Sequence, residues 1–153
     1  MSVTDPAIIA RQARLSTLAK APGPRLCALF AAYAPQAPSH EVLRAPEIGT
    51  VMLRGRAGAV GAPFNLGEMT VTRAAVRLAS GAVGHGHVQG RDKAAALAAA
   101  LIDALAEDGQ GDAIEAAILA PLRADAEAGR TARATRAAAT KVEFFTMVRG
   151  EDA

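Results

Sequence analysis

The sequence predicts an α+β fold: an N-terminal helical hairpin, an antiparallel β-meander, two Ala-rich helices packed on one face of the sheet, and a C-terminal strand. Apolar residues recur at helical spacing before residue 38 and again after residue 92. Between residues 41 and 90 the pattern changes to the alternation of β-strands, interrupted by turns that contain glycine. The length of 153 residues suits one domain. Because no repeat or linker divides the chain, we expect residues 1–153 to form a single domain.

The first 38 residues are expected to form the helical hairpin. Asp5-Pro6 is a good helix start, because aspartate caps free backbone N–H groups and proline is favoured in the first turn. Pro22-Gly23-Pro24 then separates the first helix from a second, shorter one. Pro35 and Pro38 end the second helix.

The meander is expected to contain three or four short strands. Two of them, residues 42–44 and 50–56, lie on either side of a turn at Pro46. A glycine-rich turn at 57–61 follows, and the longest strand covers 68–79. Ser80-Gly81 is a hairpin signal, which predicts that residues 82–89 pair back on the long strand.

Alternation divides the side chains of this sheet between two faces. One face is expected to be apolar and to carry helices, and Gly84 and Gly86 would let a helix approach it closely. On that face we place Val51, Leu53, Val76 and Leu78. The opposite face is expected to collect the cationic side chains and two histidines, namely Arg54, Arg56, Arg73, Arg77, His85 and His87.

Two Ala-rich helices are expected after the meander. Asp92 should cap the first, and Gly109 should end it. Asp112 opens the second, which is expected to bend near Pro121 and to stop at Gly129. Residues 130–140 are compatible with either a helix or a mobile connector.

The C-terminal residues 141–149 have the alternation of a strand that is apolar on both faces. Val142, Phe144 and Val148 share one face, while the other carries Phe145 and Met147 beside charged residues. Each apolar face must be buried against another surface, and the core of the domain can bury only one of the two. We therefore predict a partner interface that includes Phe145, Met147 and Arg149.

Composition argues against several classes of protein. A net charge of +2 and an aromatic content of 3% argue against nucleic-acid binding. The N-terminus does not resemble a signal peptide and no apolar run approaches a membrane span, so a soluble, cytoplasmic protein without membrane contact is expected. The single cysteine, Cys27, excludes an internal disulfide and suits a small buried position.

The arginines of the sheet are the best candidates for binding chemistry. Guanidinium groups suit phosphate, phosphonate and carboxylate, so Arg54, Arg56, Arg73 and Arg77 are candidate anion-binding residues. The alternative, which is favoured, is a solvated or partner-paired surface. His85-x-His87 could begin a metal site but lacks a third ligand, so a polar sheet face is favoured. The glycine-rich loop at 55–61 resembles a phosphate-binding loop but lacks a following helix start, so a tight connection between strands is favoured. The residues alone indicate no catalytic constellation and no cofactor site.

Several segments, in order along the chain, resemble one family. They are Arg11-Gln12, Arg44-Ala45-Pro46-Glu47-Ile48-Gly49, residues 61–78, Val88-Gln89-Gly90-Arg91-Asp92-Lys93, and residues 142–150. The family is PhnG, the G subunits of the carbon–phosphorus lyase core complex. Two departures are His85-Gly86-His87, where the family tends to carry aromatic residues, and Ala59-Val60, where a Gly-Thr pair is usual.

The resemblance implies an accessory role in a transferase complex. Together with the H, I and L subunits, such a protein is required to transfer the ribose triphosphate of ATP to methylphosphonate with release of adenine. The I subunit is the closest implied partner and holds the nucleosidase-type chemistry. The H and J subunits are implied in the same hetero-oligomer with two-fold symmetry. No catalytic, metal-binding or cofactor-binding residue in this chain follows, since ATP is a substrate of the complex.

Two further hypotheses stay open beside assembly and active-site support. In one, the arginine-rich face binds the triphosphate or the phosphonate directly. In the other, the chain is a stand-alone ligand-binding module. Assembly is favoured, because the expected C-terminal strand carries apolar groups on both faces.

Overall fold

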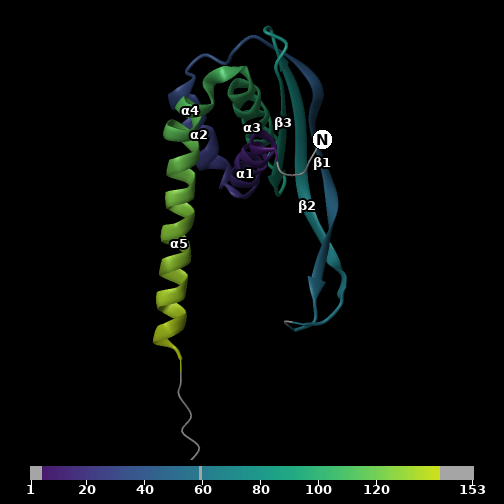
Figure 1. Ribbon diagram of the computed structural model, residues 1–153, viewed down its shortest axis with the longest axis vertical. Coiled ribbons are helices and arrows are strands. Elements are labelled where there is room, and N and C mark those ends of the chain that lie inside the picture. The colour runs from purple at the N-terminus through teal and green to yellow at the C-terminus, as the bar shows by residue number, and fades with distance from the viewer. Residues whose placement is uncertain (1–4, 59, 142–153) are drawn as a thin grey trace, which may run out of the picture.

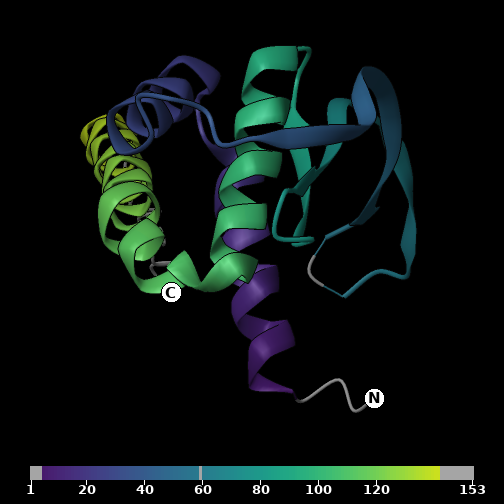
Figure 2. The ribbon, with the colours of Figure 1, turned by 90° about the horizontal axis from the view of Figure 1, so that it is seen from above.

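The computed structural model describes residues 5–58 and 60–141, which form one sheet with helices on one side of it. The sheet is antiparallel, with strand order β1-β2-β3. Figure 2, which looks along the layers, shows the helices together on one side of the strands. The expected α+β class is therefore confirmed.

The N-terminal hairpin is formed by α1 (Pro6–Lys20) and α2 (Gly23–Tyr33). The carboxylate of Asp5 accepts a hydrogen bond of 2.9 Å from the backbone N–H of Ala7, which is the expected cap. The two helices bury Leu18, Leu26 and Phe30 in the core. Caps and prolines act locally, so these helix limits were predictable from the sequence.

The sheet consists of β1 (His40–Arg56), β2 (Pro63–Leu78) and β3 (Val83–Gln89). The expectation of two short strands separated at Pro46 is wrong, because β1 is continuous. Its register against β2 shifts between Val42 and Arg44 and again between Arg44 and Glu47. Bulges of this kind leave a residue unpaired, so the missing N–H of Pro46 costs the ladder nothing.

The helix that covers the sheet is α3 (Lys93–Leu105), capped by Asp92, whose carboxylate accepts from the N–H of Ala95 at 2.9 Å. Its backbone lies directly on β3. A Cβ added to Gly86 would come within 1.9 Å of the carbonyl oxygen of Ala96, and one added to Gly84 within 2.0 Å of that of Ala100. The predicted close approach at these glycines is confirmed.

The helical chain continues beyond α3 through two π-turns, Ala106–Gln110 and Glu115–Leu119, to α4 (Gly111–Ile114) and α5 (Ala120–Ala139). Gly109 interrupts the helix, as expected, with a φ of 92°. The expected stop at Gly129 is wrong, since Gly129 lies inside α5. The Ala- and Arg-rich sequence on both sides favours helix by more than the roughly 1 kcal/mol that one glycine costs.

Two parts of the molecule project from this layered body. Helix α5 buries only Leu122 of its own residues, and it projects downward on the left of Figure 1, roughly parallel to the long strands. The paired ends of β1 and β2 extend below α1 and α3, on the opposite side of the same view from α5. None of the described helices is long and apolar enough to cross a membrane. The expected C-terminal strand, with Phe145, Met147 and Arg149, lies outside the described residues.

Candidate functional site

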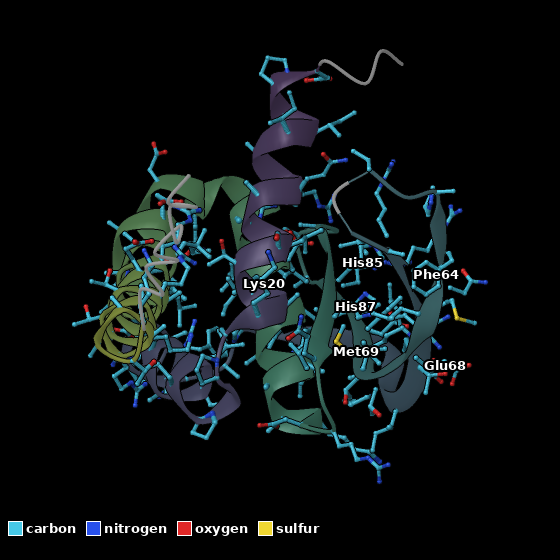
Figure 3. All side chains as sticks on the ribbon, turned by 90° about the horizontal axis from the view of Figure 1, so that it is seen from below. Lys20, Phe64, Glu68, Met69, His85 and His87 are labelled. Atoms are coloured by element: carbon cyan, nitrogen blue, oxygen red, sulfur yellow. The ribbon has the colours of Figure 1, made fainter. Side chains whose placement is uncertain are left out.

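The sheet face that points away from the helices, here called the open face, carries part of the predicted charged cluster. The register pairs Arg73 with both Glu47 and His87, and it pairs Arg77 with Glu41. Residues directly opposite each other share a face. Figure 3 shows His85 and His87 next to each other on one side of β3. The predicted grouping of Arg73, Arg77 and the two histidines is thus confirmed.

Arg54 and Arg56 do not belong to this cluster, so the expected face of four arginines is wrong. Val51 pairs with Met69 and Leu53 with Gly67, in the same alternation that places Glu47 opposite Arg73. Val51 and Leu53 therefore share the open face, and Arg54 and Arg56, which follow Leu53 in the alternation, point the other way. The two bulges before Glu47 set this register, and alternation alone does not reveal it.

Each arginine of the open face has a carboxylate partner. Arg73 Nη2 lies 3.1 Å from Glu47 Oε1, and Arg44 Nη1 lies 3.2 Å from the same oxygen. Arg77 Nη1 lies 3.4 Å from Glu41 Oε2. Sequence reasoning missed Arg44 and both glutamates, since their role depends on cross-strand pairing. The i,i+3 spacing of Arg44 and Glu47 was the only local signal.

A hollow of about 480 Å³ opens on this face beside the Arg44–Glu47–Arg73 group. It is lined by Leu43, Arg44, Arg73, Ala74, Ala75, His85, Gly86 and His87. Two guanidinium groups and two imidazoles converge there, and all can donate hydrogen bonds to an oxyanion. The described residues contain no group of three or more His, Cys, Asp or Glu that could hold a metal ion.

The projecting ends of β1 and β2 are here called the arm, residues 48–66, of which 48–58 and 60–66 are described. Of nine large hydrophobic residues exposed in the described part of the chain, eight lie between positions 42 and 66, and the ninth is Ile9 on α1. Within the arm these are Ile48, Met52, Leu53, Val60, Phe64 and Leu66. Soluble proteins seldom gather so many exposed apolar side chains on one element without a binding role.

The apolar groups of the arm lie on both of its faces. Leu53 lies on the open face, and so does Phe64, which pairs with Gly55. Ile48 and Met52 lie on the opposite face of the arm, where they pair with Thr72 and Glu68. Figure 3 shows the same alternation at the base of the arm, where Met69 and Glu68 point to opposite sides. The arm is therefore a two-stranded ribbon with exposed apolar side chains on both faces.

A second hollow, of about 560 Å³, lies between the end of α1 and α5, away from the open face. Lys20, labelled in Figure 3, lies beside it on α1. Two of its arginines are occupied by neighbours on the helices: Arg123 pairs with Glu115, and Arg130 with Glu127. These pairs explain Arg123 and Arg130 as helix-surface charges.

The chain matches known proteins over most of its length. The family model described as "Phosphonate metabolism protein PhnG" matches residues 9–150. The chain belongs to the PhnG family. It is also 51% identical, over 110 residues, to the "Alpha-D-ribose 1-methylphosphonate 5-triphosphate synthase subunit PhnG" of Rhizobium meliloti (strain 1021). That alignment covers 72% of this chain and 70% of the relative.

The segments that resemble the PhnG family now have structural roles. The segment at 44–49 contains Glu47, the carboxylate shared by two arginines of the open face. The long segment at 61–78 is essentially β2, the central strand. The segment at 88–93 joins β3 to α3 and supplies the cap Asp92. In this PhnG-family chain the matched motifs therefore build the sheet and its covering helix.

Arg11, from the first of these segments, belongs to a partly buried ionic network around the buried carboxylate of Asp103. Its Nη2 donates to Asp103 Oδ2 at 2.7 Å and to the carbonyl oxygen of Val83 at 3.2 Å. Burial alone lowers the pKa of Arg11, but hydrogen bonding to Asp103 and the charges of Asp103 and Glu107 outweigh it, so that the pKa is raised. The network occupies the free edge of β3 and holds the strand that carries the histidines.

Proposed function

We propose that this chain is an accessory subunit of a ribose 1-methylphosphonate 5-triphosphate synthase, where it supports the shape of a catalytic partner. Membership of the PhnG family and the name of the Rhizobium relative support the proposal. The structural observation that carries it is the arm, which exposes large apolar side chains on two faces. Exposing such an apolar surface to water is unfavourable in free energy, and burying it against a partner protein removes this contribution.

The proposed partners are other subunits of the same system. The I subunit is the closest, the H and J subunits complete a hetero-oligomer with two-fold symmetry, and the L subunit acts with them functionally. In this proposal the reaction transfers the ribose triphosphate of ATP to methylphosphonate and releases adenine in the cytoplasm. ATP is a substrate of the complex, and the chain itself needs no cofactor.

The proposal is tested by measuring adenine release. The H, I and L subunits are mixed with ATP and methylphosphonate, with and without this chain, and adenine is quantified by chromatography. Adenine release that requires the chain is the expected result. Equal release in its absence would contradict an accessory role in this reaction.

A second candidate function is direct anion binding in the hollow of the open face. The supporting observation is the convergence of Arg44, Arg73, His85 and His87 on one hollow, with Glu47 as the shared partner of both arginines. A phosphonate or phosphate dianion would compete with Glu47 for the two guanidinium groups. The set differs from the one that the sequence suggested, since Arg54 and Arg56 are absent from it.

Calorimetry separates the two candidates. Methylphosphonate or ATP at millimolar concentration is titrated into the wild-type chain and into Arg73→Gln, with Arg25→Gln on α2 as the matched control. A heat of binding that the wild type and Arg25→Gln show and Arg73→Gln lacks would support the anion site. No heat with the wild type leaves assembly as the function of the chain.

A further inference from the structure

We propose that the arm inserts as a two-sided wedge into an apolar cleft, with an acidic rim, on a different subunit of the synthase. This inference rests on the proposed function, and it specifies which surface makes the contact and what the partner must offer. It concerns residues 48–66, which the predicted C-terminal interface does not include.

The apolar side chains of the arm lie on two faces, so a partner must bury both faces. Leu53 and Phe64 face one way and Met52 faces the other, so a flat partner surface would leave one set in water. The helices of the chain do not supply the second cover, because Met52, Leu53 and Phe64 all remain more than one-third exposed. A cleft with two walls satisfies both faces at once.

The large apolar side chains of the arm are well exposed. Met52 is 54% exposed, Leu66 65% and Val60 95%, and the other large apolar residues of the arm are more than one-third exposed. Each partner in a stable protein interface buries roughly 800 Å², and these six exposed side chains would contribute apolar area to such a contact.

The charge of the arm indicates the chemistry of the cleft. Residues 48–66 include Arg54 and Arg56 but no aspartate or glutamate. Both arginines alternate onto the same face as Met52. Acidic groups at the rim of the cleft would pair with them, which steers association and fixes orientation.

The same charges argue against a second copy of this chain as the occupant. In a two-fold contact each arm would meet the identical surface of the other. Arg54 and Arg56 of both copies would then lie in one interface to which neither arm brings a carboxylate, and gathering like charges in an interface is unfavourable. A different subunit avoids this conflict.

The test uses co-purification with the other subunits of the synthase. Met52→Ser combined with Leu53→Ser changes one exposed residue on each face of the arm. The matched control is Ile9→Ser, which removes a side chain that is 50% exposed on α1. We expect the arm variant to reduce recovery of this chain with affinity-tagged partner subunits at least about tenfold. The control should be recovered like the wild type.

A second measurement needs no variant and guards against misfolding. Amide hydrogen exchange of the wild-type chain, alone and in the assembled complex, should show new protection over residues 48–66. Charge reversal at Arg54 and Arg56 should weaken assembly more at low salt than at high salt, whereas Arg130→Glu on α5 should not.

Three outcomes would overturn the inference. They are wild-type recovery of the arm variant, unchanged exchange of the arm in the complex, and a homodimer of the isolated chain that the arm variant abolishes. The adenine assay keeps the two proposals apart. If the wild type does not stimulate adenine release, the proposed function fails. If the wild type and the arm variant stimulate it equally, only the role of the arm fails.

Discussion

Arg14 holds Asp103 through two hydrogen bonds to a single carboxylate oxygen. Arg14 Nε lies 2.9 Å and Nη2 2.8 Å from Asp103 Oδ1, and the side chain of Asp103 has no exposed surface. The other oxygen, Oδ2, accepts from Arg11 and from the backbone N–H of His85 at 3.0 Å. One buried carboxylate therefore ties α1, α3 and β3 together, with every lone-pair direction in use.

Replacing this carboxylate should strongly destabilise the fold. Asp103→Ala leaves the guanidinium groups of Arg11 and Arg14 without their buried partner, and we expect a loss of about 3–5 kcal/mol in the free energy of unfolding. Urea denaturation followed by circular dichroism measures it. Glu127→Ala, which removes an exposed pair with Arg130, should stay within about 1 kcal/mol of wild type. Equal effects of the two substitutions would contradict the role of Asp103.

The contact between β3 and α3 makes a second prediction. Gly86→Ala forces a Cβ to within 1.9 Å of the carbonyl oxygen of Ala96, so the helix must move off the sheet. We expect destabilisation of at least about 1–3 kcal/mol, the usual cost of overpacking. Gly67→Ala is the control, because a Cβ at Gly67 meets nothing within 4 Å. The melting temperatures of both variants are compared with that of the wild type. An unchanged melting temperature for Gly86→Ala would contradict the close contact.

Features of the fold that depend on neighbouring residues were predictable from the sequence. Asp5 and Asp92 cap the helices that they precede, and Gly109 interrupts the helix at the expected position. The continuity of β1 was not predictable, because Pro46 normally interrupts a strand and only the bulges around it preserve the pairing.

The site was harder to predict because it depends on contacts between distant residues. Arg11 and Asp103 are separated by 92 positions, and no local pattern links them. The opposite orientation of Arg54 and Arg73 follows from a register that bulges fix, and a shift by one residue exchanges the faces. The arm was missed for a similar reason, since the exposure of Met52 and Leu53 depends on where the helices end.

Cys27 should react slowly with thiol reagents in the folded chain. Burial and the negative charge of Asp92 both raise the pKa of its thiol, so less thiolate is present at pH 8 than in the unfolded chain. The rate with a disulfide reagent should rise on unfolding in urea, and its pH midpoint should fall toward about 8.5. By linkage, folding should lose stability as the pH rises above that value. Equal rates in the folded and unfolded chain would contradict this environment.

Gly109 and Gly111 offer a matched pair that tests the break after α3. Gly109 has a φ of 92°, whereas Gly111, two residues later, has an ordinary helical φ of −54° and ψ of −47°. Gly109→Ala should lower the free energy of unfolding by about 1–2 kcal/mol, because a Cβ is strained in the left-handed region. Gly111→Ala should raise it by about 0.4–1 kcal/mol, because alanine restricts the unfolded chain without native strain. Urea denaturation of the two variants should therefore move in opposite directions from wild type, and a shift of both in the same direction would rule out the left-handed residue at the end of α3.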